Sequence, residues 1–184
     1  PTASNVKISP PSPKESDKLE CSYNYADTDG DLESGTTLRW YRNETLQSKY
    51  NDVKEIPSGI TRSGDQWHVV VRPGDGTIQG KYETSVIITV GNTPPEVSNL
   101  IVEIALSGDL TGKYTYYDAG GDKEDGSEIR WYKNSVLQPK YNDQKTVLSS
   151  EVQKSEQWYF SVKARDGTDY GELQASPSVT IGNA

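Results

Sequence analysis

The residues of this sequence that could do chemistry are carboxylates grouped in short loops. Asp27, Asp29 and Asp31 alternate within one stretch rich in Asp and Gly, and Asp75 follows a later hydrophobic run. Ca²⁺ takes six to eight oxygen ligands in flexible geometry, so carboxylates that converge from two loops could hold it. The pattern returns later in the chain, with candidate calcium ligands at Asp118, Asp122 and Asp166.

The same residues are also ordinary turn formers. Asp bonds the backbone of its own turn, and Asp-Gly is a common turn dipeptide. An EF-hand is excluded, because Leu32 and Leu38 stand where that loop needs a Gly and a bidentate Glu. Gly120 stands where the first set has Asp29, which weakens the calcium interpretation for the second set. Calcium binding and turn formation are therefore two open interpretations.

Other kinds of chemistry find little support in the sequence. One His and one Cys cannot build a zinc or Cys–His site, and His68 falls on an outward position of its strand. No nucleophile elbow, phosphate loop or dinucleotide fingerprint is present. The formal net charge of −8 and the pI near 4.7 disfavour a nucleic-acid partner. We therefore expect a protein that is not an enzyme.

The chain repeats itself at an offset of about 91 residues. Leu-Arg-Trp-Tyr-Arg-Asn at 38–43 returns as Ile-Arg-Trp-Tyr-Lys-Asn, and Lys-Tyr-Asn-Asp at 49–52 returns unchanged. The sequence therefore predicts two modules, residues 1–93 and 94–184. Pro94-Pro95 lies at the boundary as a stiff, extended connector, so we expect an elongated arrangement of the two modules.

Hydrophobic residues within each module alternate with a period of two, which indicates half-buried strands. About seven short strands in 90 residues, separated by turns rich in Gly and Asp, predict an all-β fold of β-sandwich type. The alternation places these residues in the core: Leu38, Trp40, Trp67, Val69, Val71, Val86, Ile88 and Val90, then Ile129, Trp131, Trp158, Phe160, Val162, Val179 and Ile181.

Three motifs follow one another in a recognisable order. The first is a strand that ends in an Asp-rich turn, and the second is a Trp-Tyr strand followed by Asn. The third is Gly-Asp-Gln-Trp, which leads into a strand closed by Asp-Gly. This order resembles the immunoglobulin-like modules strung in tandem through large archaeal and bacterial cell-surface proteins. The resemblance implies two tandem Ig-like β-sandwich domains. It also implies that Trp40 and Trp131 are the core Trp of strand C and that Trp67 and Trp158 begin strand F.

One departure from the antibody type of domain concerns its disulfide, which joins strands B and F. Cys21 has no second Cys to pair with, and Gly112 takes its place in the second module. Aromatic burial must then supply the stability that a disulfide would give. We expect Cys21 to be a buried, inert thiol.

Aromatic residues outside the predicted core raise a second possible use. Four tyrosines could be exposed platforms for a sugar or could close the edge of the sandwich: Tyr41, Tyr132, and Tyr50 and Tyr141 in the two Lys-Tyr-Asn-Asp loops. Asn43-Glu44-Thr45 is a glycosylation acceptor triplet.

These features predict non-catalytic spacer modules in an interior fragment of an exported protein, located outside the cell at its surface. A stalk, an adhesin or an S-layer would use such modules, stiffened by Ca²⁺ at the junction in an arrangement similar to that of cadherins. The alternatives are a glycan- or protein-binding adhesion module and an accessory domain of a secreted hydrolase. Expected partners are neighbouring Ig-like modules of the same chain and a cell-surface protein or glycan. No stretch of the sequence is a membrane span or a signal peptide.

Overall fold

The computed structural model describes residues 1–182 of the 184-residue chain. The chain divides into two compact units, Pro1–Thr93 and Pro94–Ala184, which we call module 1 and module 2. Each unit has a hydrophobic core built only from its own residues. Each core is therefore complete within about 90 residues.

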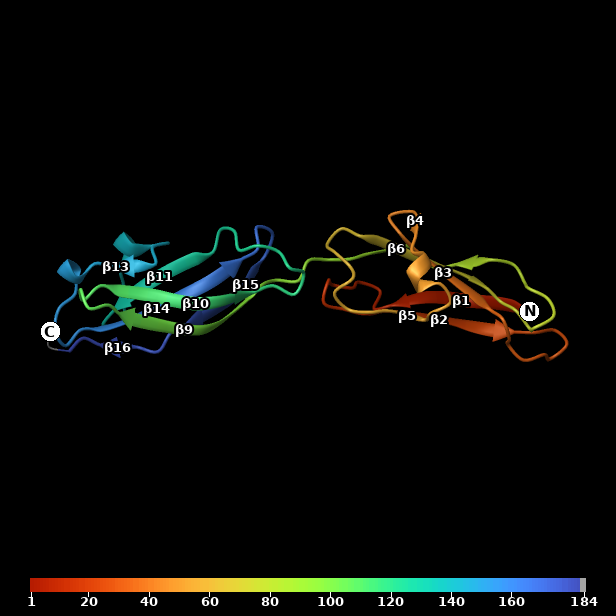
Figure 1. The fold of residues 1–184 in the computed structure, drawn as a ribbon, viewed down its shortest axis with the longest axis horizontal. Coiled ribbons are helices and arrows are strands. Elements are labelled where there is room, and N and C mark those ends of the chain that lie inside the picture. The colour runs from red at the N-terminus through yellow and green to blue at the C-terminus, as the bar shows by residue number, and fades with distance from the viewer. Residues whose placement is uncertain (183–184) are drawn as a thin grey trace. The chain divides into compact units, whose positions relative to one another are not determined.

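Module 1 is a sandwich of two antiparallel sheets (Figure 1). A three-stranded sheet and a larger five-stranded sheet face each other across the core. The strands of the first, in spatial order, are β1 (Thr2–Ser9), β2 (Leu19–Ala26) and β5 (Glu55–Ile56). Those of the second are β4 (Thr45–Leu46), β3 (Thr37–Arg42), β6 (Gln66–Arg72) and β7 (Glu83–Thr84), with β8 (Ile88–Thr89) also pairing with β6.

Module 2 repeats this topology strand for strand. Its smaller sheet contains β9 (Glu96–Ile104), β10 (Leu110–Tyr117) and β13 (Thr146–Val147). Its larger sheet contains β12 (Val136–Leu137), β11 (Glu128–Lys133), β14 (Gln157–Arg165), β15 (Tyr170–Ala175) and β16 (Val179–Thr180). The helical segments among residues 1–182 are three 3-10 turns: η1 (Ser48–Tyr50), η2 (Pro139–Tyr141) and η3 (Ser149–Glu151). The all-β fold with two tandem sandwiches is thus confirmed.

A pair of tryptophans forms the centre of each core, as the alternation predicted. Trp40 on β3 and Trp67 on β6 meet edge to face with ring centroids 6.3 Å apart, and both are fully buried. Trp131 and Trp158 form the same pair at 6.3 Å. The Nε1 of Trp40 donates to the carbonyl of Val53 at 2.9 Å, which fixes the indole. Burial of this much aromatic surface supplies the stabilisation that the missing disulfide would give.

The exchange of Cys21 for Gly112 between the modules has a packing reason. Cys21 is 5% exposed and unpaired. A Cβ on Gly112 would lie 3.2 Å from three ring atoms of Phe160, which stands where module 1 has Val69. The larger ring thus occupies space that module 1 fills with the Cys side chain.

The closing strand of module 1 differs from the expectation, because Val86 is 74% exposed rather than buried. Ser85 takes the inward position instead, and its Oγ accepts the N–H of Val69 at 3.1 Å. The same hydroxyl donates to the carbonyl of Val86 at 2.9 Å. This local bonding splits the strand into β7 and β8 and reverses the alternation, so the prediction for Val86 was wrong. Ile88 and Val90 are buried as predicted.

Candidate functional site

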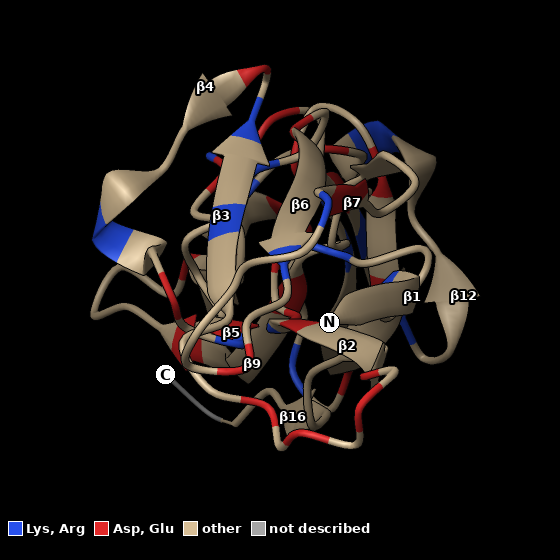
Figure 2. Ribbon diagram, turned by 90° about the vertical axis from the view of Figure 1, so that its right-hand side faces the viewer, with Lys and Arg blue, Asp and Glu red and all other residues tan. Residues whose placement is uncertain are grey.

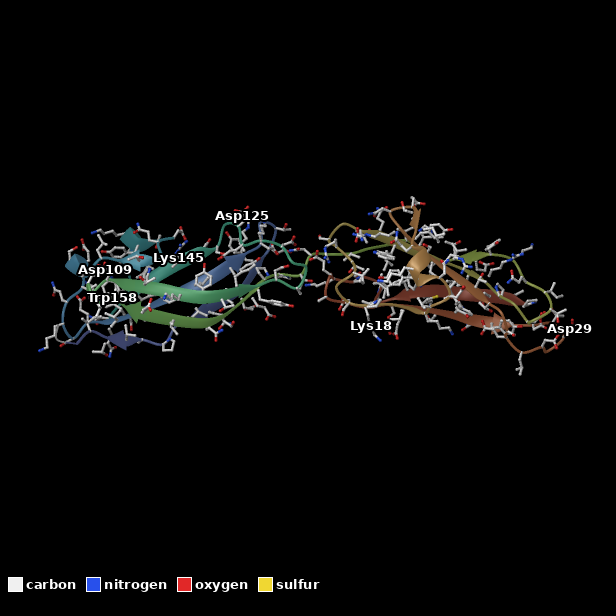
Figure 3. The ribbon with its side chains drawn as sticks, in the orientation of Figure 1. Lys18, Asp29, Asp109, Asp125, Lys145 and Trp158 are labelled. Carbon is white, nitrogen blue, oxygen red and sulfur yellow. The ribbon has the colours of Figure 1, made fainter. Side chains whose placement is uncertain are left out.

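The loop after the second strand and the loop after the sixth strand meet at one end of each sandwich. In module 1 the N–H of Ser34 donates to the carbonyl of Gly74 at 2.9 Å. In module 2 the N–H of Asp125 donates to the carbonyl of Arg165 at 2.8 Å. Figure 3 shows Asp29 in the loop after β2 and Asp125 in the loop before β11. These paired loops carry all seven candidate calcium ligands.

Asp27 closes its own loop through one carboxylate oxygen. Its Oδ1 accepts the amides of Asp29 and Asp31 at 2.8 and 3.3 Å. Its Oδ2 forms an ion pair with the α-ammonium of Pro1 at 2.9 Å. The hydrogen bond from Pro1, then that from Asp29, lowers the pKa of the Asp27 carboxyl. Asp29 and Asp31 are exposed, so they serve this turn through their backbone rather than their side chains.

Asp75 and Asp166 are equivalent turn residues in the two modules. The Oδ1 of Asp75 accepts the amides two and three residues ahead, each at 2.7 Å. The Oδ1 of Asp166 makes the same two bonds at 2.7 Å. The two amides, that of Ile78 first, lower the pKa of the Asp75 carboxyl, because they stabilise its charged form. Each carboxylate thus uses one oxygen to hold its turn.

Asp118 closes the equivalent loop of module 2 through one carboxylate oxygen. Its Oδ1 accepts the amide of Asp122 at 2.9 Å. Its Oδ2 is buried and has no hydrogen-bond partner. Asp118 is therefore a carboxylate with one unused oxygen.

A tyrosine lies among the carboxylates of each module. Burial first, and then the nearby charges of Asp118 and Asp166, raise the pKa of Tyr116 to about 12. Burial and the charges of Asp27 and Asp75 raise the pKa of Tyr25 in the same way. The structure therefore brings carboxylates from both loops to one place in each module.

The repeated Lys-Tyr-Asn-Asp motif has a structural role that the sequence did not reveal. The Oδ1 of Asp52 accepts the amide of Leu38 at 3.0 Å and pairs with the guanidinium of Arg39. Asp143 makes the same contacts in module 2, where the amide of Ile129 is the main cause of its lowered pKa. Figure 2 shows the basic positions of β3 in blue along the strand. The motif therefore ties the loop to the strand that carries the core Trp.

The outer face of each larger sheet carries a stacked aromatic pair. The rings of Tyr41 and His68 lie 4.8 Å apart at an interplanar angle of 4°, and those of Tyr132 and Tyr159 lie 4.7 Å apart at 6°. His68 is half-buried in this stack on the outward side of β6. It therefore faces away from the core, as its position in the strand indicated.

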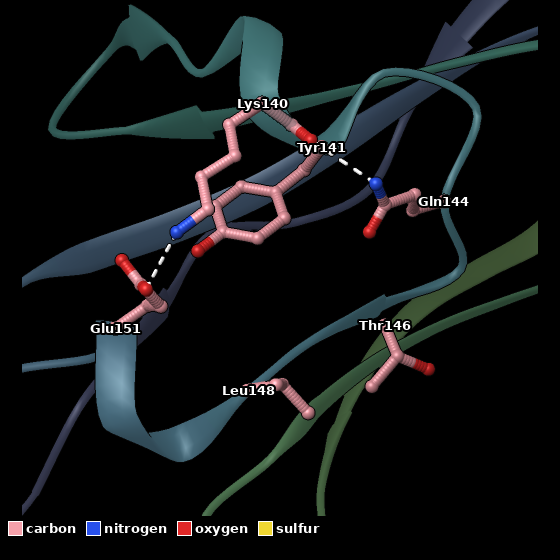
Figure 4. Close-up of a pocket in the computed structure, with 6 residues that line it drawn as sticks. All are labelled: Lys140, Tyr141, Gln144, Thr146, Leu148 and Glu151. Carbon is pink, nitrogen blue, oxygen red and sulfur yellow. Dashed lines mark hydrogen bonds and ion pairs between the residues drawn. The ribbon is translucent and has the colours of Figure 1, made fainter.

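Tyr141 is not the exposed platform that the sequence allowed. It is 6% exposed and packs edge-on against Trp158 with ring centroids 6.3 Å apart. Its equivalent Tyr50 is half-buried. Tyr141 instead forms the wall of a pocket of about 150 Å³ in module 2 (Figure 4). The pocket is lined by Lys140, Tyr141, Gln144, Thr146, Leu148 and Glu151.

Comparison with known proteins shows the fold and no family. No protein-family model matches the chain, and no curated protein matches its sequence. The chicken interferon gamma receptor alpha chain is similar over 100% of this chain and 99% of its own, at 9% identity and a TM-score of 0.51. A two-domain fibronectin type III segment of chicken tenascin matches 97% of this chain and 99% of its own, at 11% identity and a TM-score of 0.43.

A third solved structure, the FN1–FN3 domains of chicken CNTN1, is matched over the whole chain at 11% identity and a TM-score of 0.38. The chain spans 65% of that structure. The strand order of each module, together with the likeness to the interferon receptor chain, shows that the chain folds as two tandem immunoglobulin-like β-sandwich domains.

Proposed function

We propose that the chain is a pair of non-catalytic structural modules of an extracellular, cell-surface protein, such as a stalk, an adhesin or a surface layer. The observation that carries this proposal is the repetition of one sandwich, each copy with a complete core of its own. Tandem domains of this fold commonly serve as structural or binding modules of extracellular or receptor proteins. No helix within residues 1–182 is long and apolar enough to cross a membrane.

A contact between two distant segments of module 1 suits a module that carries load. The N–H of Gly91 donates to the carbonyl of Pro13 at 2.7 Å, and Lys14 and Gly91 form a parallel bridge. This bridge joins the segment after β1 to the segment after β8.

Single-molecule stretching of the full chain tests the proposal. Two separate unfolding events are expected, each releasing about 90 residues, or about 300 Å at roughly 3.3–3.6 Å per residue. Gly91→Pro removes the N–H of the bridge, so it should lower the unfolding force of one event and leave the other event as an internal reference. A single event for the whole chain, or extension without resistance, would contradict a load-bearing role.

We also propose that module 2 takes up Ca²⁺ at its paired loops. The observation that favours this site is Asp118, which is 9% exposed and has one oxygen without a donor. A carboxylate of Asp122 lies within 4.8 Å of it, and hard oxygen ligands are those that Ca²⁺ prefers. Thermal melts with Ca²⁺ and with chelator should then differ for module 2, and Asp118→Asn should remove the difference. Equal melts under both conditions would leave these residues as turn formers.

A further inference from the structure

The hairpin between β3 and β4 carries the acceptor triplet Asn43-Glu44-Thr45 at its tip. Arg42 pairs with Thr45, so Asn43 and Glu44 are the two central residues of the turn. Both have positive φ, at 48° and 62°, as a type I′ turn requires. The hairpin projects from module 1 (Figure 1, Figure 2), and all three residues of the triplet are exposed. A bulky group attached at this tip would therefore meet solvent rather than the core.

The side chain of Asn43 is oriented by two hydrogen bonds and has a second N–H beyond the one that it uses. Its Oδ1 accepts the amide of Gln66 at 2.9 Å. Its Nδ2 donates to the Oδ1 of Asp65 at 3.2 Å. A side-chain amide has two N–H bonds, so the contact with Asp65 occupies one of them. A glycan on Nδ2 replaces one hydrogen and leaves the other to donate.

The equivalent hairpin of module 2 separates what the fold requires from what an acceptor triplet requires. Asn134 and Ser135 also have positive φ, and the Oδ1 of Asn134 accepts the amide of Gln157 at 2.9 Å. Val136, which is 63% exposed, stands where module 1 has Thr45. The turn therefore forms without a hydroxyl at this position.

Thr45 accordingly has little structural work to do. Its hydroxyl makes a long bond of 3.5 Å to the carbonyl of Asn43. An acceptor triplet, in contrast, needs Ser or Thr at the second position after Asn, and Asn43-Glu44-Thr45 is the one triplet in the sequence that meets this need.

We propose that Asn43 is an N-glycan attachment site of the exported chain. The reaction joins the Nδ2 of Asn43 to the anomeric carbon of an oligosaccharide carried on a lipid pyrophosphate. The bond between that carbon and the phosphate oxygen breaks, and the lipid pyrophosphate leaves with the electron pair. One Nδ2 proton passes to a base of the transferase. This site rests on the extracellular location proposed above, because the transfer takes place during export.

A glycan at this hairpin would also protect an edge of the fold. β4 is the outer strand of the larger sheet of module 1. Exposed edge strands can pair with other chains, and a bulky, hydrated group beside the strand hinders such pairing.

The test is to send the full chain, fused to a secretion signal, through the secretory pathway of cultured eukaryotic cells. The secreted chain should carry added mass that peptide N-glycosidase removes. That enzyme leaves Asp in place of a glycosylated Asn, so peptide mapping should find this change at Asn43 alone.

Two variants give matched controls in the two hairpins. Thr45→Val reproduces module 2 and keeps Asn43 with its two contacts, so it should abolish the added mass without changing the melt of the deglycosylated chain. Val136→Thr completes a triplet at Asn134 in the same kind of turn and should add a second glycan.

The proposal is overturned if the natural chain is secreted without a glycan at Asn43, whatever Val136→Thr does, or if Thr45→Val keeps the glycan. The fused signal supplies the export in every case. A missing glycan would therefore leave the stretching experiment unchanged, and the structural role stands or falls separately.

Discussion

The two tryptophan pairs differ in one buried hydrogen bond. The Nε1 of Trp158 donates to the Oε2 of Glu156 at 3.0 Å, whereas the Nε1 of Trp67 is buried without any acceptor. Module 1 has Asp65 at the position of Glu156. Asp is one methylene shorter, so its carboxylate does not reach the indole.

The longer side chain should fit in module 1, because the two carboxylates share a backbone bond and an ion pair; Asp65 differs in also accepting from the Nδ2 of Asn43 at 3.2 Å. Asp65 accepts the amide of Arg62 at 2.7 Å and pairs with Arg42 at 2.8 Å. Glu156 accepts the amide three residues before it at 2.9 Å and pairs with Lys133 at 3.1 Å. The substitution Asp65→Glu should therefore keep both contacts and add the bond to Trp67.

An unpaired buried donor costs about 1–3 kcal/mol, and a hydrogen bond to a charged carboxylate contributes about 1.5–3 kcal/mol net. Ordering the longer Glu side chain offsets part of that gain. We expect Asp65→Glu to stabilise module 1 by about 1 kcal/mol, which raises the Tm of a domain of this size by roughly 4–8 °C. The reverse change, Glu156→Asp, should destabilise module 2 by about 1–3 kcal/mol.

Urea unfolding followed by amide peaks assigned to each module separates the two effects in the full chain. Slower exchange of the Trp67 indole proton in Asp65→Glu would report the new bond directly. If Asp65→Glu leaves module 1 unchanged or weaker, and Glu156→Asp is also neutral, the unpaired indole carries no cost and the reasoning is wrong.

Three further predictions concern the core and the turns. Gly112→Ala should destabilise module 2 by about 1–3 kcal/mol through overpacking against Phe160, and adding Phe160→Val should restore much of the loss in denaturant melts; a neutral Gly112→Ala would contradict the close approach. Burial raises the pKa of the Cys21 thiol from 9.0 to about 11. The buried, protonated thiol should therefore contribute fully to the stability of module 1 below pH 9, and this contribution should be lost as the pH rises to about 11. Fast thiol labelling of the folded chain at pH 8 would refute the burial of this thiol. The pKa of Asp75 is lowered from 3.8 in the folded chain, so its contribution to the stability of module 1 should be present above pH 3.8 and lost as the pH falls through the lower folded value. Asp75→Ala should therefore reduce the loss of module 1 stability at acid pH. An unchanged acid dependence would count against the turn bonds.

Much of the fold could be predicted from the sequence, because burial follows the alternation wherever a strand is regular. The four tryptophans illustrate this, since each stands at an inward position and is buried. Val86 is an exception to this relation between alternation and burial. The hydroxyl of Ser85 bonds the neighbouring strand and reverses the alternation, and a pattern of apolar residues contains no information on such a bond.

The candidate sites were less predictable, because their properties depend on contacts between distant segments. The calcium interpretation required carboxylates from two loops to converge, and the two loops meet in each module. The second oxygen of Asp118 is buried without a donor, which depends on how the folded chain packs around it. The burial of Tyr141 depends on its packing against Trp158. The sequence repeat did not indicate this contact.

The central claim is that each module is a self-contained sandwich with its own core. The most direct test is to produce residues 1–93 and 94–184 separately and to compare their NMR spectra and thermal melts with those of the full chain. Each fragment should melt cooperatively and reproduce the dispersed amide peaks of its module, apart from shifts near residues 93 and 94. If either fragment is unfolded on its own, its core is not complete within the module and the account is contradicted.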